Sequence, residues 1–365
     1  MKRNLIFALT FALVMSAFFP AQVAAQADNW NNWRALPQGT FGGNATIQRV
    51  AWAGAPGPHG FIAVETNGVI ARSANGSAWT AITVPESGLD TFGNWALAWG
   101  NPGGQGRFFM TQTWAEGYVG NQWWQFVVMY TSPTGTQWAR YGAFNTSDGG
   151  SLANIRPSIG NIVWGGPAGR QRFVGVGNEF VMHSADGIAA SAFTFPGINF
   201  RGLAWGGQGG QQRFITAGHY GDSVWIFSSA DGESWNWLDG GPVAALGNGV
   251  NAIAWGGPAG RQRFVAVGNG GIIAHSPDGA AWTAVANSPF GSSNVNAIAW
   301  GGPAGRERFV AAGNDGRIAH STDGAVWTLV PDSTFGAAHI NDIAAGQGRF
   351  VAVGGGGRMA LLTFD

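Results

Sequence analysis

Aromatic and polar side chains suited to binding a ligand gather in two stretches of the sequence. The first, Thr113–Trp124, mixes indole and phenol rings with a carboxylate and amides, and the second, His219–Trp225, places an imidazole, a phenol and a carboxylate close together. Aromatic faces supply contact area while acids and histidine orient polar groups, so we expect both stretches to line one concave site. The candidate ligand-binding residues are Trp114, Glu116, Tyr118, Trp123, His219, Tyr220 and Asp222.

The sequence offers little for catalysis or metal binding. His183, His275 and His320 recur at one equivalent position in related stretches, and no His/carboxylate cluster has the spacing of metal ligands. Cysteine is absent, which excludes thiol catalysis and disulfides. Outside a recurring Asp-Gly motif, few acids remain, and none forms the carboxylate pair that glycoside hydrolysis requires. We therefore predict no catalytic residue, no metal and no cofactor.

A repeated unit must position these side chains. Residues Val250–Asn269 differ from Val295–Asn314 at only two positions, and weaker copies precede them. Each copy has four short runs typical of strands, separated by turn residues such as Gly-Gly-Pro-Ala-Gly and Asp-Gly. The copies end on an aromatic residue, which is found at Trp33, Trp79, Trp138, Phe193, Trp235, Trp282 and Trp327.

The spacing of the copies predicts the fold. Four strands in about 45–50 residues is the size of one propeller blade, and seven closing aromatics match seven blades. The last copy, from Ile340, ends before its closing Trp, whereas Trp33–Gly42 matches Trp327–Gly336. We therefore predict an all-β, seven-bladed β-propeller of four-stranded antiparallel blades, whose ring is closed by an N-terminal strand. Closure removes the exposed strand edges, which favours a monomer.

The turn motif Ser-x-Asp-Gly-x-x-Trp resembles the Asp-box, or BNR, hairpin of sialidase-like propellers. It occurs at Ser229–Trp235, Ser276–Trp282 and Ser321–Trp327, in a variant one residue shorter between Asp and Gly. The resemblance implies that the carboxylate accepts backbone N–H bonds within the turn and that the Trp packs between blades. It therefore implies a structural role for four residues, Asp186, Asp231, Asp278 and Asp323.

The same resemblance raises a glycoside hydrolase of the sialidase type as the alternative function. Family sialidases have six blades and carry a Phe/Tyr-Arg-Ile-Pro motif, which this sequence lacks. The arginines here recur at the same turn of several copies, which is typical of solvated turn charges and not of a converging substrate site. We therefore interpret the protein as a non-catalytic binding or scaffolding propeller that recognises carbohydrate or an envelope or extracellular protein.

Residues 1–27 have the pattern of a cleaved signal peptide. Lys2 and Arg3 precede the apolar run Leu5–Phe19, and Ala25 and Ala27 both suit cleavage. Residues 28–365 then form a single propeller domain, secreted or periplasmic, with no cysteine for a lipid anchor and no later apolar span. The formal net charge of zero argues against a nucleic-acid partner.

Overall fold

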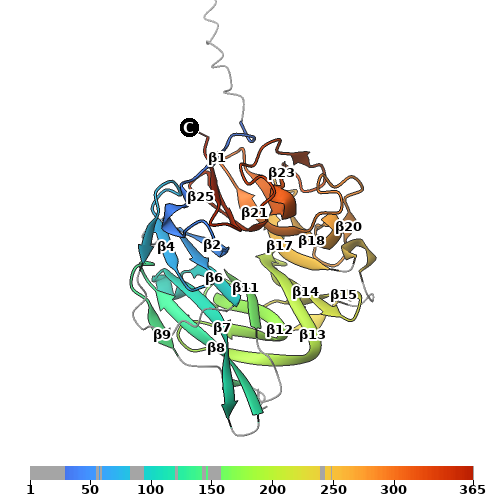
Figure 1. Cartoon of the computed structure of the whole chain (residues 1–365). Coiled ribbons are helices and arrows are strands. Elements are labelled where there is room, and N and C mark those ends of the chain that lie inside the picture. The colour runs from blue at the N-terminus through green and yellow to red at the C-terminus, as the bar shows by residue number, and fades with distance from the viewer. Residues whose placement is uncertain are drawn as a thin grey trace, which may run out of the picture.

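The computed structural model describes residues 29–54, 57, 60–82, 94–119, 122–141, 145–146, 158–238, 243–247 and 249–364. The predicted signal peptide, residues 1–27, lies outside this part of the chain. The described residues form six sheets that stand around a central axis, which is the architecture of a β-propeller (Figure 1). Among these residues, no helix is both long enough and apolar enough to cross a membrane.

Five of the sheets have four antiparallel strands each. The Ala-Ile-Ala-Trp run forms the innermost strand, and the Arg-Phe-Val-Ala run forms the second strand, which is buried on both faces between neighbouring sheets. The strands are β2 (Ile47–Ala53), β3 (Gly60–Glu65), β4 (Ile70–Ser73) and β5 (Thr80–Ile82); β6 (Asn94–Gly100), β7 (Arg107–Val119), β8 (Gln122–Ser132) and β9 (Ala139–Tyr141); β17 (Val250–Gly256), β18 (Arg263–Gly268), β19 (Ile273–Ser276) and β20 (Thr283–Ala284); β21 (Val295–Gly301), β22 (Arg308–Gly313), β23 (Ile318–Ser321) and β24 (Thr328–Leu329); and β25 (Ile340–Gly346), β26 (Arg349–Gly354) and β27 (Met359–Leu362) with β1 (Trp33–Ala35).

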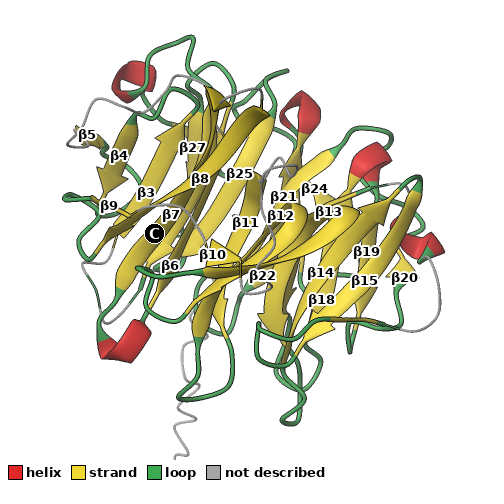
Figure 2. Cartoon of the chain, turned by 90° about the horizontal axis from the view of Figure 1, so that it is seen from below, coloured by secondary structure: helices red, strands yellow, loops and turns green. Residues whose placement is uncertain are grey.

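The sixth sheet shows that the predicted blade count was wrong. The propeller has six blades, not seven, because the third and fourth repeats share one seven-stranded sheet. Strand β13 runs without a break from its pairing with β12, at Phe193, to its pairing with β14, at Trp205. The six residues between Phe193 and Phe200 continue the strand instead of forming a loop before the next inner strand. The strands of this sheet, several of which lie side by side in Figure 2, are β11 (Ser158–Gly165), β12 (Arg172–Ser184), β13 (Ser191–Gly206), β14 (Arg213–Tyr220), β15 (Ser223–Ser229) and β16 (Asn236–Trp237), with β10 (Asn145–Thr146) parallel to β13.

A tryptophan–phenylalanine pair recurs in the core of the repeats. Trp255 on β17 faces Phe264 on β18 with ring centroids 4.5 Å apart, and Trp300 and Phe309 repeat the contact at 4.6 Å. Glycine follows each of these tryptophans because the next sheet packs against that position. A Cβ atom at Gly256 would lie 2.2 Å from Trp300 Cγ, which no packed structure tolerates. The repeated Trp-Gly sequence therefore sets how closely the sheets approach.

The N-terminal segment closes the ring, which confirms that part of the prediction. Strand β1 pairs with β27, with Trp33 opposite Leu362, so the last sheet takes strands from both ends of the chain. This last copy has Ala345 where the others have the inner-strand tryptophan. Trp30 supplies an indole there instead: it is only 2% exposed and packs 5.8 Å from Phe350.

Candidate functional site

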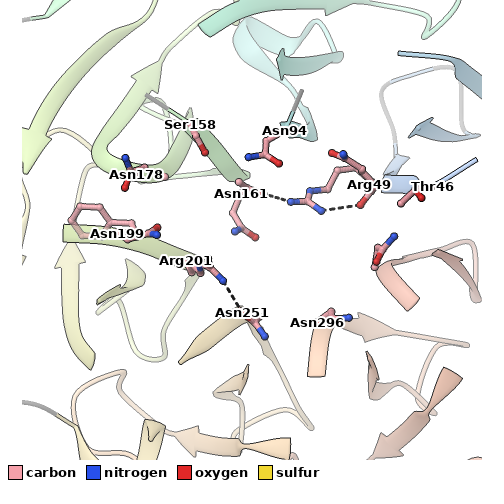
Figure 3. A pocket seen from close by; sticks show the side chains of 15 residues that line it. Thr46, Arg49, Asn94, Ser158, Asn161, Asn178, Asn199, Arg201, Asn251 and Asn296 are labelled. Atoms are coloured by element: carbon pink, nitrogen blue, oxygen red, sulfur yellow. Dashed lines mark hydrogen bonds between the residues drawn. The ribbon is translucent and has the colours of Figure 1, made fainter. Parts of the chain in front are cut away.

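A polar pocket lies on the propeller axis, at the end where the innermost strands begin. Its volume is about 470 Å³. Seven asparagines, one glutamine and two arginines contribute to its lining, and no lining residue is an acid. Figure 3 shows these side chains converging from several sheets. The pocket therefore offers amide groups and positive charge, with little apolar surface.

Three of the asparagines join neighbouring sheets. Asn251, Asn296 and Asn341 occupy one repeat position, the second residue of an inner strand. Each Nδ2 donates a hydrogen bond to the first carbonyl oxygen of the next inner strand, at 2.8–3.0 Å. The bond from Asn341 crosses the junction between the last sheet and the first. The donating amide groups of these asparagines therefore join each sheet to the next around the ring.

This pattern of amides breaks in the second and third repeats, where Trp95 and Gly160 take the asparagine position. Arg49 of β2 reaches into the gap: its Nη2 donates to Gly160 O at 2.9 Å and its Nη1 to Gln48 O at 2.8 Å. The guanidinium thus spans from β2 past β6 to β11 and narrows the axial passage (Figure 3). Asp342 lies near it, and burial raises the pKa of that carboxyl to about 6 despite the attraction of Arg49.

Arg201 occupies the asparagine position, equivalent to Asn251, in the fourth repeat. Its side chain is exposed, and among the described residues its one hydrogen bond runs from Nη1 to Asn251 Oδ1 at 3.4 Å. Burial and, second, the charge of Arg201 lower the pKa of the neighbouring His219 imidazole. That imidazole is therefore neutral near pH 7, and its buried Nε2 has no partner within the described chain.

Asn161 and Asn199 present amides that the protein itself does not use. Asn161 points toward the middle of the pocket in Figure 3, and Asn199 on β13 lies opposite His219 on β14. Neither side chain hydrogen-bonds to another described residue. A primary amide has two N–H donors and an acceptor oxygen, so each side chain can both donate hydrogen bonds to a ligand and accept them from it.

Four of the predicted ligand-binding residues lie in a long hairpin. Trp114, Glu116 and Tyr118 belong to β7 and Trp123 to β8, whose paired backbones extend beyond the ring at the bottom of Figure 1. Their side chains lie outside the described part of the structure. Their role in a ligand site stays a prediction.

The other three predicted residues lie at β14 and the turn after it. His219 lies close enough to Arg201 of the pocket lining for the Arg201 charge to lower the pKa of its imidazole, but His219 is not itself a lining residue. Tyr220 is 62% exposed and Asp222 is exposed in the turn, away from the pocket lining. None of these three residues lines the pocket, and His219 adjoins it through Arg201. Sequence reasoning missed Arg49 and Arg201, which a comparison of inner strands reveals because Arg49 stands where three other copies have alanine and Arg201 where three have asparagine.

The Ser-x-Asp-Gly-x-x-Trp turns have the hydrogen bonds that a structural role needs. Asp278 Oδ1 accepts bonds from the backbone N–H of Ala280 at 2.8 Å and of Ala281 at 3.1 Å. The Ser276 hydroxyl also donates to it, and Trp282 Nε1 donates to the carbonyl of the turn glycine. The corresponding bonds recur at Asp186, Asp231 and Asp323. These contacts support the predicted turn role without testing it.

Three repeated arginines are not the solvated turn charges that the sequence suggested. Arg308 Nη1 donates to His320 Nδ1 at 2.9 Å, and the same pairing joins Arg172 to His183 and Arg263 to His275. Burial and, second, the Arg308 guanidinium lower the pKa of His320 to about 4, so the ring is neutral and accepts the bond. Arg172 also forms an ion pair with Glu233 of the neighbouring repeat. Among the described residues, no group of three His, Cys, Asp or Glu residues could hold a metal.

Comparison with known proteins bears on the fold. No protein-family model matches the sequence, and no curated protein matches it. Solved structures match at low identity over most of the chain. YCF48 bound to D1 peptide is 16% identical, the alignment covers 92% of this chain and 96% of that one, and the TM-score is 0.60.

Two further solved structures show the same architecture. A catalytically inactive virginiamycin B lyase from Staphylococcus aureus, with quinupristin, is 13% identical over 91% of this chain and 99% of its own, with a TM-score of 0.64. The WD40 β-propeller domain of Doa1 is 11% identical over 91% and 97%, with a TM-score of 0.55. At these identities the likeness shows a β-propeller and nothing finer.

Proposed function

We propose that this protein is a non-catalytic binding propeller that holds an extended polypeptide segment in its axial pocket. The observation that carries the proposal is the pocket itself, with the uncommitted amides of Asn161 and Asn199 and the exposed guanidinium of Arg201. The predicted signal peptide favours a partner outside the cytoplasm, in the periplasm or beyond the cell.

The lining favours a peptide over a sugar. Amide side chains donate and accept, which matches the alternating N–H and C=O groups of an extended chain. Sugar sites rely on exposed aromatic faces, and the one aromatic residue of the lining, Phe200, is only 1% exposed. A structural neighbour, YCF48, is bound to a peptide, which supports the choice by analogy of fold. Carbohydrate binding by the β7–β8 hairpin stays a separate prediction.

The alternative of a sialidase-type glycoside hydrolase has no support in this pocket. With six blades, the blade count no longer separates the protein from family sialidases. The reaction needs two carboxyl groups placed on either side of a glycosidic bond. No acid lines the pocket, and Asp342, which lies beside Arg49 of the lining, accepts a hydrogen bond from the backbone N–H of Val50. A screen with fluorogenic glycosides would reveal activity directly.

A pool of random octapeptides, each carrying an N-terminal fluorescein, tests the proposal by fluorescence anisotropy against the purified protein. We expect saturable binding to the wild type. The substitution Asn161→Trp fills the pocket and should reduce affinity at least tenfold. The matched control is Ala259→Trp, which adds the same ring at an exposed turn between β17 and β18, at the other end of the inner strand.

Two outcomes would overturn the proposal. One is an absence of binding to the pool at millimolar concentration. The other is equal affinity in the wild type and Asn161→Trp, which would move the site away from the axis. A glycan array run with the same proteins completes the experiment: glycan binding that Asn161→Trp abolishes would replace the peptide with a sugar.

A further inference from the structure

The two positive charges of the axial pocket are not equivalent. Both terminal nitrogens of Arg49 donate hydrogen bonds, to the carbonyl oxygens of Gln48 and Gly160, and Asp342 balances part of its charge. Arg49 therefore has a structural role, because it links β2 to β11 past β6. It is not available to a ligand without breaking bonds that join β2 to β11.

Arg201 is free by comparison. No carboxylate pairs with it within the described chain, and its bond to Asn251 is at the upper limit of hydrogen-bond length. A guanidinium has five donors in a planar fork, so at least four remain available. An exposed, unpaired fork of this kind matches the two oxygens of a carboxylate.

The groups around Arg201 suit an anion. Asn199 and Asn161 offer N–H donors on β13 and β11, and no acid lines the pocket to repel a negative charge. His219 stays neutral near pH 7 because burial and then Arg201 lower its pKa, so it adds no positive charge beside Arg201. The local field is therefore positive and is centred on Arg201.

The shape of the pocket favours the end of a chain. Arg201 stands at the second residue of its inner strand, whereas Arg49 stands one residue further along its own strand and crosses to Gly160. A peptide that enters the pocket where the inner strands begin meets the Arg49 guanidinium across its path. An internal segment would have to enter and turn back within about 470 Å³, but a terminus enters end-on.

We propose that Arg201 receives the C-terminal carboxylate of a peptide, with Asn161 and Asn199 contacting the last peptide groups. This inference rests on the proposed function and specifies its ligand. The planar carboxylate accepts a forked pair of N–H bonds from the guanidinium, and the amides fix the backbone that precedes it. Recognition is then of a chain end and not of a particular side chain.

Three octapeptide pools without Asp or Glu, each labelled at the N-terminus with an uncharged BODIPY fluorophore that has no carboxylate, provide the test. The first has a free C-terminal carboxylate, the second is amidated, and the third is amidated with one internal Glu. Because a hydrogen-bonded charge contributes about 1.5–3 kcal/mol, we expect the first pool to bind about 10- to 100-fold more tightly than the second. Arg201→Gln should abolish this preference, and the exposed turn variant Arg261→Gln should keep it.

The outcomes separate this inference from the proposed function. Equal binding of the free and amidated pools shows that the site takes peptides without reading their ends, which overturns the inference alone. A third pool that binds as tightly as the first shows that any carboxylate suffices, which overturns the assignment to the chain end. Absence of binding by all three pools overturns both proposals. Raised salt should shrink the preference, because the contact with Arg201 is exposed.

Discussion

The replacement Trp30→Ala tests whether an indole from the N-terminal segment substitutes for the tryptophan missing from the last repeat. Trp30 is 2% exposed, and its ring centroid lies 4.6 Å from that of Phe364. The Arg308 guanidinium stands 4.8 Å from the ring, which adds a cation–π contact. The substitution empties this space at the junction between the last two sheets.

The expected loss follows from burial. Removal of a buried tryptophan side chain costs about 3–5 kcal/mol, including the cavity that is left. An unfolding entropy of about 2.1 cal/mol/K per residue gives roughly 0.75 kcal/mol/K for a chain of this length. The melting temperature should therefore fall by about 4–7 °C. Ala345→Trp in the Trp30→Ala background should recover part of this loss, because Gly301 lies against Ala345 as Gly256 lies against Trp300.

Differential scanning calorimetry of the purified protein measures the shift. The control is Trp237→Ala, which removes the same side chain from a position that is 62% exposed and should lower the melting temperature by about 1 °C or less. Equal shifts in the two variants would refute the reasoning. So would a double variant no more stable than Trp30→Ala, because the indole would then not occupy the vacant repeat position.

Three further predictions concern the turns, a buried acid and the sheet spacing. Asp278→Ala should cost about 1–2 kcal/mol in urea unfolding, through two lost backbone hydrogen bonds, whereas Asp278→Asn, which keeps the acceptor oxygen, should cost less. The pKa of Asp342 is raised to about 6 in the folded protein, so the stability that its protonated form contributes is lost as the pH rises from about 4 to 6. The melting temperature of Asp342→Asn should therefore rise relative to that of the wild type across this pH range. A difference in melting temperature that stays constant with pH would contradict this prediction. Gly256→Ala should prevent folding or lower the melting temperature by many degrees, because its Cβ meets Trp300, whereas Gly39→Ala, with open space around it, should leave stability within about 0.5 kcal/mol.

The repeat predicted the sheets well because each copy carries its own strand and turn signals. The alternation of apolar runs with Gly-rich turns and the split last copy specified the strands and the closing β1. The count failed at one place. A closing aromatic marks a copy but not a separate sheet, and the short link from Phe193 to Phe200 lets β13 serve two copies.

The candidate site was harder to predict because it forms where different repeats meet. Loops that break the repeat drew attention to the β7–β8 and β14–β15 turns, but among the described side chains of these turns none lines the pocket, and His219 only neighbours Arg201 of the lining. The informative departures are single residues on inner strands: Arg201 stands where the three later copies have asparagine, and Arg49 stands where three other copies have alanine. Their convergence depends on ring geometry, which no local pattern encodes.

Closure of the ring has a mechanical consequence. In the antiparallel pair of β1 with β27, Trp33 lies opposite Leu362 and Ala35 opposite Ala360, so both termini leave from the same end of the pair. A force that pulls the termini apart therefore acts across the hydrogen bonds and loads them one after another, from Trp33 onward. Such peeling meets less resistance than shear, in which all bonds share the load. Tension between the ends would open the propeller at this seam and leave the other sheets paired.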